Sequence, residues 1–231
     1  MNEITQIRKL SLWIFIIPFI TINLCLLISI NFNLFENTFL IVDQIGRSQF
    51  TIPYIDGSLS ISRASRTYPQ FMVFKPGMII TAFLLYFYWC KNNSLINSFR
   101  GTKKIQNNFK IFGILSAFFL AIHCLLLGVE TDVKLLKFLR RVILLNFIIF
   151  EIIAQGLLVY NFYKLKNKIK HLFNKKILIS KIILVSLLAL IALLSIPILL
   201  IEGDVHFKHA LEWNYFLGII FFYLLTRFFW R

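Results

Sequence analysis

Six apolar stretches, each long enough to cross a lipid bilayer as a helix, constrain the fold of this chain more than any other feature. The hydrocarbon layer is roughly 30 Å thick, and a helix needs about 20 residues to cross it. The stretches cover Leu10–Ile30, Phe71–Cys90, Ile111–Val129, Val142–Tyr160, Ile179–Ile201 and Trp213–Trp230. The sequence therefore predicts an all-α integral membrane protein, in which residues 1–231 form one six-transmembrane helix bundle.

Composition supports a membrane protein over a soluble one, because 58% hydrophobic residues in 231 are more than one soluble core of this size encloses. No long tract alternates polar and apolar residues, so a β-barrel is not indicated. The segment after the first stretch, "NFNLFEN", contains no small-residue cleavage site, which favours a retained span. Cys25, Cys90 and Cys124 lie in or beside apolar stretches, and no disulfide is expected.

The basic residues behind the formal charge of +15 are distributed as membrane topology requires, which excludes nucleic acid as a partner. Lysines and arginines concentrate in the second and fourth gaps between stretches, while acidic residues concentrate in the first, third and fifth gaps. By the positive-inside rule, the basic gaps and both termini face the cytoplasm. We expect a multi-pass protein, placed in the plasma (inner) membrane if the chain is bacterial.

The fourth gap, "KLKNKIKHLFNKK", is the most basic segment. The first explanation of its positive charge is that it determines membrane topology. The alternative is contact with anionic lipid, which attracts juxtamembrane lysines by about 1 kcal/mol each. The lysines that would make this contact are Lys164, Lys166, Lys168, Lys170, Lys175 and Lys176.

The first outer gap, about residues 32–70, is long enough to form a small cap between the first two spans. Two β-branched and aromatic runs, "FLIVDQIG" and "SQFTIPYIDG", each end in glycine and predict two short strands. The cap is therefore expected to contain β-structure packed on the bundle.

The end of this cap, "DGSLSIS", places Ser58, Ser60 and Ser62 on one face if the segment is extended. Arg63 and Arg66 follow, so hydroxyls and guanidinium groups converge where a phosphate or carboxylate headgroup would lie. The alternative is a turn-rich cap whose hydroxyls bond their own backbone.

Polar side chains inside the spans are functional candidates because burying charge in a bilayer is costly. Glu151 lies near the middle of the fourth span, and Gln155 is one helical turn further on the same face. His123 in the third span is expected at a similar depth, so that His123 and Glu151 meet between neighbouring helices. Such a pair performs acid–base or proton-transfer chemistry, or else holds the bundle together through hydrogen bonds.

The last outer gap, "EGDVHFKHALEW", combines histidines and carboxylates without the spacing of a known zinc motif. No metal or other cofactor is expected. His209, Glu212 and Trp213 share one face where the last span begins, either as a site or as an interfacial collar with Trp213 as the aromatic anchor.

A first outer loop ending in "PYIDGSLSIS", a second span ending in "LLYFYW" and a last span opening with "HALEW" resemble the Frag/DRAM/Sfk family. This family joins the damage-regulated autophagy modulators with the Golgi factor that acts after glycosylphosphatidylinositol attachment and with the Cwh-like N-terminal domain. The resemblance covers essentially the whole chain and implies a polytopic protein that acts on, or responds to, membrane lipids. It marks as site positions Asp56, Ser58, Ser60, Ser62, His209, Glu212 and Trp213. The chain differs from the lipid-anchor branch at the outer start of the fourth span, where "KFLRR" stands and no histidine does.

Together these patterns predict a multi-pass protein that binds membrane lipids and helps to remodel or sense them through an extracytoplasmic polar site. Its headgroup-binding residues are predicted to be Asp56, Ser58, Ser60, Ser62, Arg63, Arg66 and Trp213. An enzyme would use His123, Glu151, His209 and Glu212 as acid–base groups. A non-catalytic membrane scaffold is the first alternative, and a small-solute transporter is the second.

Overall fold

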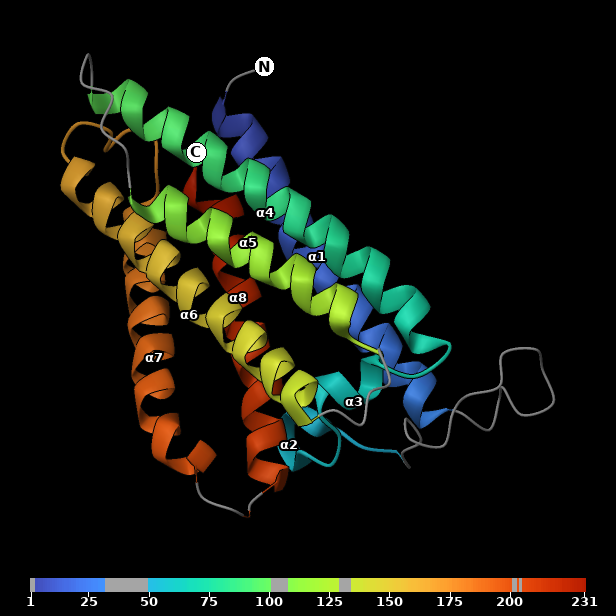
Figure 1. Cartoon of the computed structure of the whole chain (residues 1–231). Helices are drawn as coiled ribbons and strands as arrows, with labels where there is room; N and C mark the ends of the chain where they lie inside the picture. Colours follow the sequence, from blue (N-terminus) through green and yellow to red (C-terminus); the bar gives the residue numbers. More distant parts are fainter. Residues whose placement is uncertain (1–2, 32–49, 101–107, 129–133, 201–202, 204) are drawn as a thin grey trace.

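Six long helices run through the molecule in alternating directions (Figure 1). The computed structural model describes residues 3–31, 50–100, 108–128, 134–200, 203 and 205–231. The long helices are α1 (Glu3–Ile30), α4 (Gln70–Arg100), α5 (Asn108–Leu126), α6 (Lys134–Leu165), α7 (Lys175–Leu200) and α8 (Val205–Phe229). Two short helices, α2 (Pro53–Asp56) and α3 (Ile61–Ser65), lie at the opposite end from both chain termini. We call this end the cap end and the other the terminal end.

Five of the long helices are long and apolar enough to cross a membrane: α1, α4, α5, α6 and α7. This confirms an α-helical membrane protein with several spans. The described part of each predicted apolar stretch lies mostly on one long helix, but α8 does not meet the same criterion. Its sequence is diluted by polar residues such as Asn214, Thr226 and Arg227.

Neighbouring helices approach closely because small residues stand where they touch. Helix α4 packs against α1 and α5, α5 packs against α6, and α8 packs against α1 and α7. A Cβ atom added to Gly77 would lie 2.2 Å from the hydroxyl oxygen of Thr21, and one on Gly113 would lie 2.3 Å from the Trp89 ring. Lipid gives helices no hydrophobic incentive to associate, so close backbone packing of this kind stabilises the bundle.

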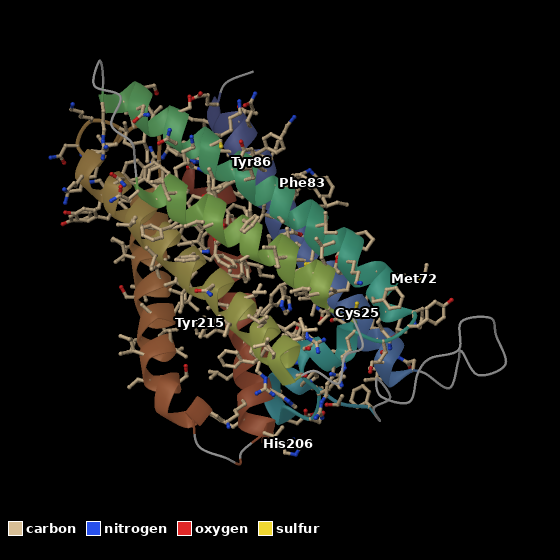
Figure 2. All side chains as sticks on the ribbon, viewed as in Figure 1. Cys25, Met72, Phe83, Tyr86, His206 and Tyr215 are labelled. Atoms are coloured by element: carbon tan, nitrogen blue, oxygen red, sulfur yellow. The ribbon has the colours of Figure 1, made fainter. Side chains whose placement is uncertain are left out.

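Large apolar side chains cover the outside of the bundle, as a lipid environment requires. Figure 2 shows Met72, Phe83 and Tyr86 projecting from α4, where Phe83 is 63% exposed. The same helix buries Tyr88 and Trp89 completely on its inner face. Helix α4 therefore presents one aromatic face to the surroundings and another to the core.

At the terminal end, the C-terminus is fastened to the connection between α6 and α7. Phe173 stacks on Phe229 with ring centroids 5.0 Å apart, and the N–H of Arg231 donates to the carbonyl of Leu172 at 3.0 Å. The lysines of the basic segment surround this anchor: Lys164, Lys168, Lys170, Lys175 and Lys176 are exposed, and Lys166 is half-buried. They lie together at the terminal end, as expected for a determinant of topology.

The prediction of strands in the cap is wrong for the segment that the structure describes. Residues 39–46, the first predicted strand, lie outside the described residues. The second, residues 48–57, contains helix α2, which begins with Pro53 at its first position. Proline has the backbone angle of a helix start, and the Asp56 side chain bonds the backbone N–H of Ile52 at 2.9 Å. These local contacts outweigh the β-propensity of the run.

The extended conformation expected for "DGSLSIS" is also wrong. Ser60 is the N-cap of α3, because its hydroxyl oxygen accepts a 3.1 Å hydrogen bond from the backbone N–H of Arg63. Ser62 therefore lies inside a helix. The three serine hydroxyls do not share one extended face.

Candidate functional site

The first turns of α8 hold the cap by its main-chain carbonyls. The indole N–H of Trp213 donates to the carbonyl of Leu59 at 2.7 Å, and Nδ2 of Asn214 donates to that of Tyr54 at 2.7 Å. Nδ1 of His209 lies 3.0 Å from the carbonyl oxygen of Gly57. Because a carbonyl only accepts, Nδ1 carries the proton and Nε2 of a neutral His209 is left as an acceptor.

Gly57 makes this docking possible. Its φ of +60° lies in the left-handed region, and a Cβ at this position would lie 1.7 Å from the carbonyl oxygen of His206. Only glycine fits here, because any side chain would collide with the backbone of α8. The cap is therefore seated on α8 by backbone-to-backbone contact.

Asp56 organises the preceding turn. Its carboxylate accepts from the N–H of Ser58 at 2.8 Å, the N–H of Ile52 at 2.9 Å and the hydroxyl of Thr51 at 2.8 Å. Although desolvation raises the pKa of Asp56, these hydrogen bonds lower it to about 2 overall. The ionised carboxylate holds the turn in shape.

A polar pocket of about 400 Å³ lies at the cap end, between α3, α5, α6 and α8. Arginines line it from two elements, and two histidines, two serines and one carboxylate complete its polar lining. The lining residues are Ser60, Ser62, Arg63, Arg66, His123, Leu127, Arg140, Arg141, Leu144, His209 and Glu212. With neutral histidines, four arginines against one carboxylate give the polar pocket a formal charge of +3.

The arginines of the polar pocket repel one another. Burial lowers the pKa of Arg66 first, and the positive charges of Arg63 and Arg140 lower it further. Glu212 stands just before the expected span Trp213–Trp230. Desolvation raises its pKa to about 7, although the backbone N–H groups of Ser62 and Ile61 act in the opposite direction. The polar pocket is therefore cationic at neutral pH and becomes more so as Glu212 takes up a proton.

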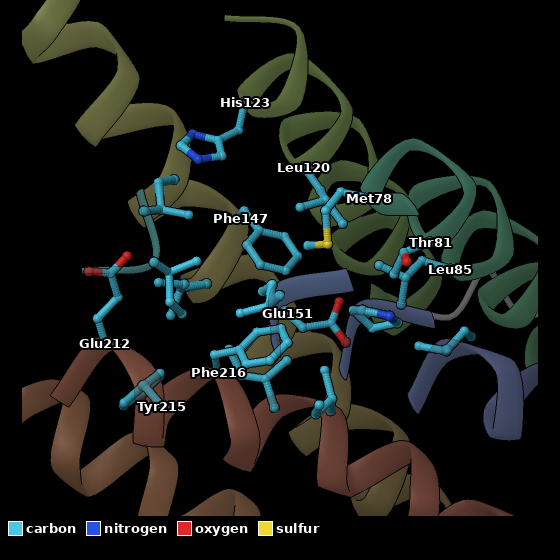
Figure 3. Close-up of a pocket in the computed structure, with 18 of the residues that line it drawn as sticks. Met78, Thr81, Leu85, Leu120, His123, Phe147, Glu151, Glu212, Tyr215 and Phe216 are labelled. Atoms are coloured by element: carbon cyan, nitrogen blue, oxygen red, sulfur yellow. The ribbon is translucent and has the colours of Figure 1, made fainter. Parts of the chain in front are cut away.

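An apolar cavity of about 100 Å³ adjoins the polar pocket inside the bundle (Figure 3). Its walls are mostly aliphatic and aromatic, and include Ile22, Phe74, Met78, Leu120, Phe147 and Ile219. Four residues line both spaces: Ser62, His123, Leu144 and Glu212. In Figure 3, His123 and Glu212 stand on one side of the cavity, and Glu151 points into it.

Glu151 is completely buried and is surrounded by hydrogen-bond donors. The hydroxyl of Ser116 donates to its Oε2 at 2.5 Å, and Nε2 of Gln155 donates to its Oε1 at 3.0 Å. The hydroxyl of Tyr223 also donates to Oε1. The expected alignment of Glu151 and Gln155 on one face is confirmed, and the buried carboxylate has the partners it requires.

Among the described residues, His123 and Glu151 do not form the expected pair, although both line the apolar cavity. The partners of Glu151 are Ser116, Gln155 and Tyr223. The ring nitrogen Nδ1 of His123 is buried without a hydrogen-bond partner among the described residues. A buried polar atom of this kind beside a cavity is left for a water molecule or a ligand group.

The structure thus brings most of the predicted site residues together and separates three of them. Ser60, Ser62, Arg63, Arg66, His123, His209 and Glu212 line the polar pocket, and Glu151 lines the apolar cavity. Asp56 and Ser58 instead stabilise the turn before α3. Trp213 is fully buried and anchors the cap.

Sequence reasoning missed Arg140 and Arg141 as members of the site. They stand at the cap end of α6, where the "KFLRR" motif was considered only as a departure from a family pattern. The signal that identifies them is the presence of two arginines on the outer side of the predicted topology, where few basic residues are expected. Tyr223, which bonds Glu151, carried no such signal because tyrosine is common in spans.

The described residues contain no cluster of three or more histidines, cysteines and carboxylates that would hold a metal ion. No family model, no curated protein and no solved structure matches this chain. The resemblance to the Frag/DRAM/Sfk family therefore stays a prediction from the motifs in the sequence.

Proposed function

We propose that this protein binds an anionic membrane lipid, with the headgroup in the polar pocket and part of an acyl chain in the apolar cavity. The observation that carries the proposal is that a cationic pocket and an apolar cavity share four wall residues. A lipid is the one abundant membrane component that combines an anionic group with a long apolar chain. The protein then acts in the remodelling or sensing of that lipid.

The charge of the polar pocket supports an anionic headgroup. Arginine binds phosphate and carboxylate groups through two parallel hydrogen bonds, and four arginines with one carboxylate leave a positive charge to be neutralised. The buried Nδ1 of His123 offers one further polar contact. Two serine hydroxyls supply additional donors.

The orientation proposed here places the cap end outside the cytoplasm. The lysines of the α6–α7 connection support it, because they lie at the terminal end with both chain termini. On this orientation, the positive-inside rule does not account for the arginines of the polar pocket. Their presence on the outer side is explained by a ligand that needs them.

The test is binding of a defined lipid to the purified protein in nanodiscs, comparing phosphatidylglycerol with phosphatidylcholine. We expect preference for the anionic lipid, and a loss of at least about a hundredfold in affinity when Arg140→Gln and Arg141→Gln are combined, because hydrogen bonds to charged groups contribute about 1.5–3 kcal/mol each. The matched control removes the same charge at the terminal end, with Lys9→Gln and Lys110→Gln. Equal binding by the two double variants would refute the proposal.

Catalysis on the bound lipid is a second candidate function, favoured by the orientation of His209. Its Nδ1–H is held by the carbonyl of Gly57, which leaves Nε2 as a base at the polar pocket, with Glu212 one turn away. Mass spectrometry of lipids incubated with the protein tests this candidate. Products formed by the wild type and lost in His209→Gln, at unchanged lipid binding, would support an enzyme, while binding without turnover would support a sensor or scaffold.

A further inference from the structure

Lys181 is a completely buried lysine that the lipid site does not use. It lies on α7, inside the segment Lys175–Ser195 that is apolar enough to cross a membrane. Its Nζ donates to the hydroxyl oxygen of Thr226 at 2.7 Å and lies 3.9 Å from the ring centroid of Phe222. An ionisable group inside a span is costly and therefore indicates a function.

The contacts of Lys181 continue toward the centre of the bundle. The hydroxyl of Thr226 lies 3.3 Å from that of Tyr88 on α4, and both residues are buried. Three helices, α7, α8 and α4, thus contribute one group each to a continuous hydrogen-bonded series. Each group carries an exchangeable proton, and that of Thr226 is donated to the carbonyl oxygen of Phe222 at 2.9 Å.

A second series begins at the apolar cavity. The carboxylate of Glu151 on α6 accepts from the hydroxyl of Tyr223 on α8. Tyr223 precedes Thr226 by three residues, so both lie on one face of α8. The rings of Tyr223 and Tyr88 are in edge-to-face contact with centroids 4.9 Å apart. The two series therefore approach each other at this pair of tyrosines.

We propose that one water joins the hydroxyls of Tyr223 and Tyr88, and that the resulting line Glu151, Tyr223, Tyr88, Thr226, Lys181 conducts protons between the apolar cavity and the terminal end of the bundle. In the elementary step, the hydroxyl of Thr226 turns from the carbonyl of Phe222 toward Tyr88 and takes a proton from the ammonium of Lys181. Each hydroxyl and the water pass one proton onward, and the carboxylate of Glu151 receives one. Lys181 becomes a neutral amine and Glu151 a neutral acid, so the buried charge is conserved. The reverse step restores both ions.

The line ends at a cavity on one side and on the same helix as an exposed lysine on the other. Glu151 lines the apolar cavity, which shares His123 and Glu212 with the polar pocket. Lys181 lies six residues from exposed Lys175, a rise of about 9 Å along α7. The ionisable groups of the line come from α4, α6, α7 and α8. Its member Thr226 and its further contacts Ser116 and Gln155 stay neutral. The proposal does not depend on lipid binding.

A simple structural role would need the same hydrogen bonds but no movement of protons. Proton flux into liposomes distinguishes a proton relay from a purely structural role. The purified protein is reconstituted with the pH-sensitive dye pyranine inside, and a valinomycin–potassium potential drives protons inward. We expect flux clearly above that of protein-free liposomes, and a fall of about tenfold or more in Lys181→Met, because the relay then lacks its terminal donor.

Two milder variants keep the lysine and keep the test valid if Lys181→Met does not fold. Thr226→Val and Tyr88→Phe each remove one hydroxyl from the line and are expected to lower the flux as well. Lys176→Met, which removes an exposed lysine from the same helix, is the matched control and should conduct like the wild type. The proposal is overturned if the wild type conducts no faster than protein-free liposomes, or if folded Thr226→Val and Tyr88→Phe proteins conduct at the wild-type rate.

Discussion

The indole nitrogen of Trp213 donates a 2.7 Å hydrogen bond to the carbonyl oxygen of Leu59, joining residues 154 positions apart in the sequence. Trp213 is completely buried, and its ring also meets that of Tyr54 at a centroid distance of 4.8 Å. This contact fixes α3, with Ser62, Arg63 and Arg66, against α8, which carries His209 and Glu212. The polar pocket exists because these two elements are held together.

Replacing Trp213 by Phe should loosen the attachment of the cap to α8 while keeping an aromatic ring at this position. The ring contact with Tyr54 persists, but the carbonyl of Leu59 loses its donor, which costs about 1–3 kcal/mol for a buried acceptor. We expect a lower melting temperature of the detergent-purified protein and weaker binding of anionic lipid. An unchanged melting temperature would show that the hydrogen bond does not secure the cap.

Replacing Gly57 by Ala should displace the cap more strongly. The new methyl group would lie 1.7 Å from the carbonyl oxygen of His206, and the positive φ at this position strains any side chain. Lipid binding and thermal stability should both fall. Gly156→Ala is the matched control, since its Cβ would meet Val185 at an ordinary 3.5 Å. If both variants behave alike, the cap is not seated as described.

Lipid affinity should depend on pH through Glu212. Its raised pKa, about 7, means that the carboxyl is protonated below neutral pH and ionised above it. The ionised form repels an anionic headgroup, so affinity should fall as the pH rises through about 7 and recover as it falls. Glu212→Gln removes this titration, and its binding measured between pH 6 and 8 should stay nearly constant. A wild-type affinity independent of pH across this interval would contradict the assignment.

Serine positions offer a further comparison within the cap. Ser62 lines both spaces, whereas Ser58 is exposed and belongs to the turn organised by Asp56. Ser62→Leu should block lipid binding because it fills the junction between the polar pocket and the apolar cavity. Ser58→Ala should leave lipid affinity within about twofold, because surface substitutions typically change stability by less than 0.5 kcal/mol. An equal loss of lipid affinity in both variants would mean that the whole loop, and not Ser62 alone, forms the binding site.

The helices were predictable because hydropathy alone sets the length of a span. The described parts of all six stretches lie mostly on helices, and five of those helices qualify as spans. The cap was not predictable in the same way. The run around Pro53 has the β-branched and aromatic composition of a strand, and only the contacts of Asp56 and the seat on α8 reveal a helical turn.

The site was partly predictable, since a serine–arginine loop and a histidine–glutamate helix start both carry unusual polar residues. The sequence did not show that Arg140 and Arg141 complete the polar pocket, because that depends on how α6 lies against α3 and α8. Lys181 was missed because its position near the start of a span makes it look like a flanking charge. Its burial against Phe222 and Thr226 is a property of the packed bundle.

The most direct test of lipid binding is an experimental structure of the protein in nanodiscs that contain phosphatidylglycerol. The account predicts lipid density with its phosphate between Arg63, Arg66, Arg140 and Arg141, and with an acyl chain passing Ser62 into the apolar cavity. An empty polar pocket at a resolution that shows lipids on the outside of the bundle would contradict it.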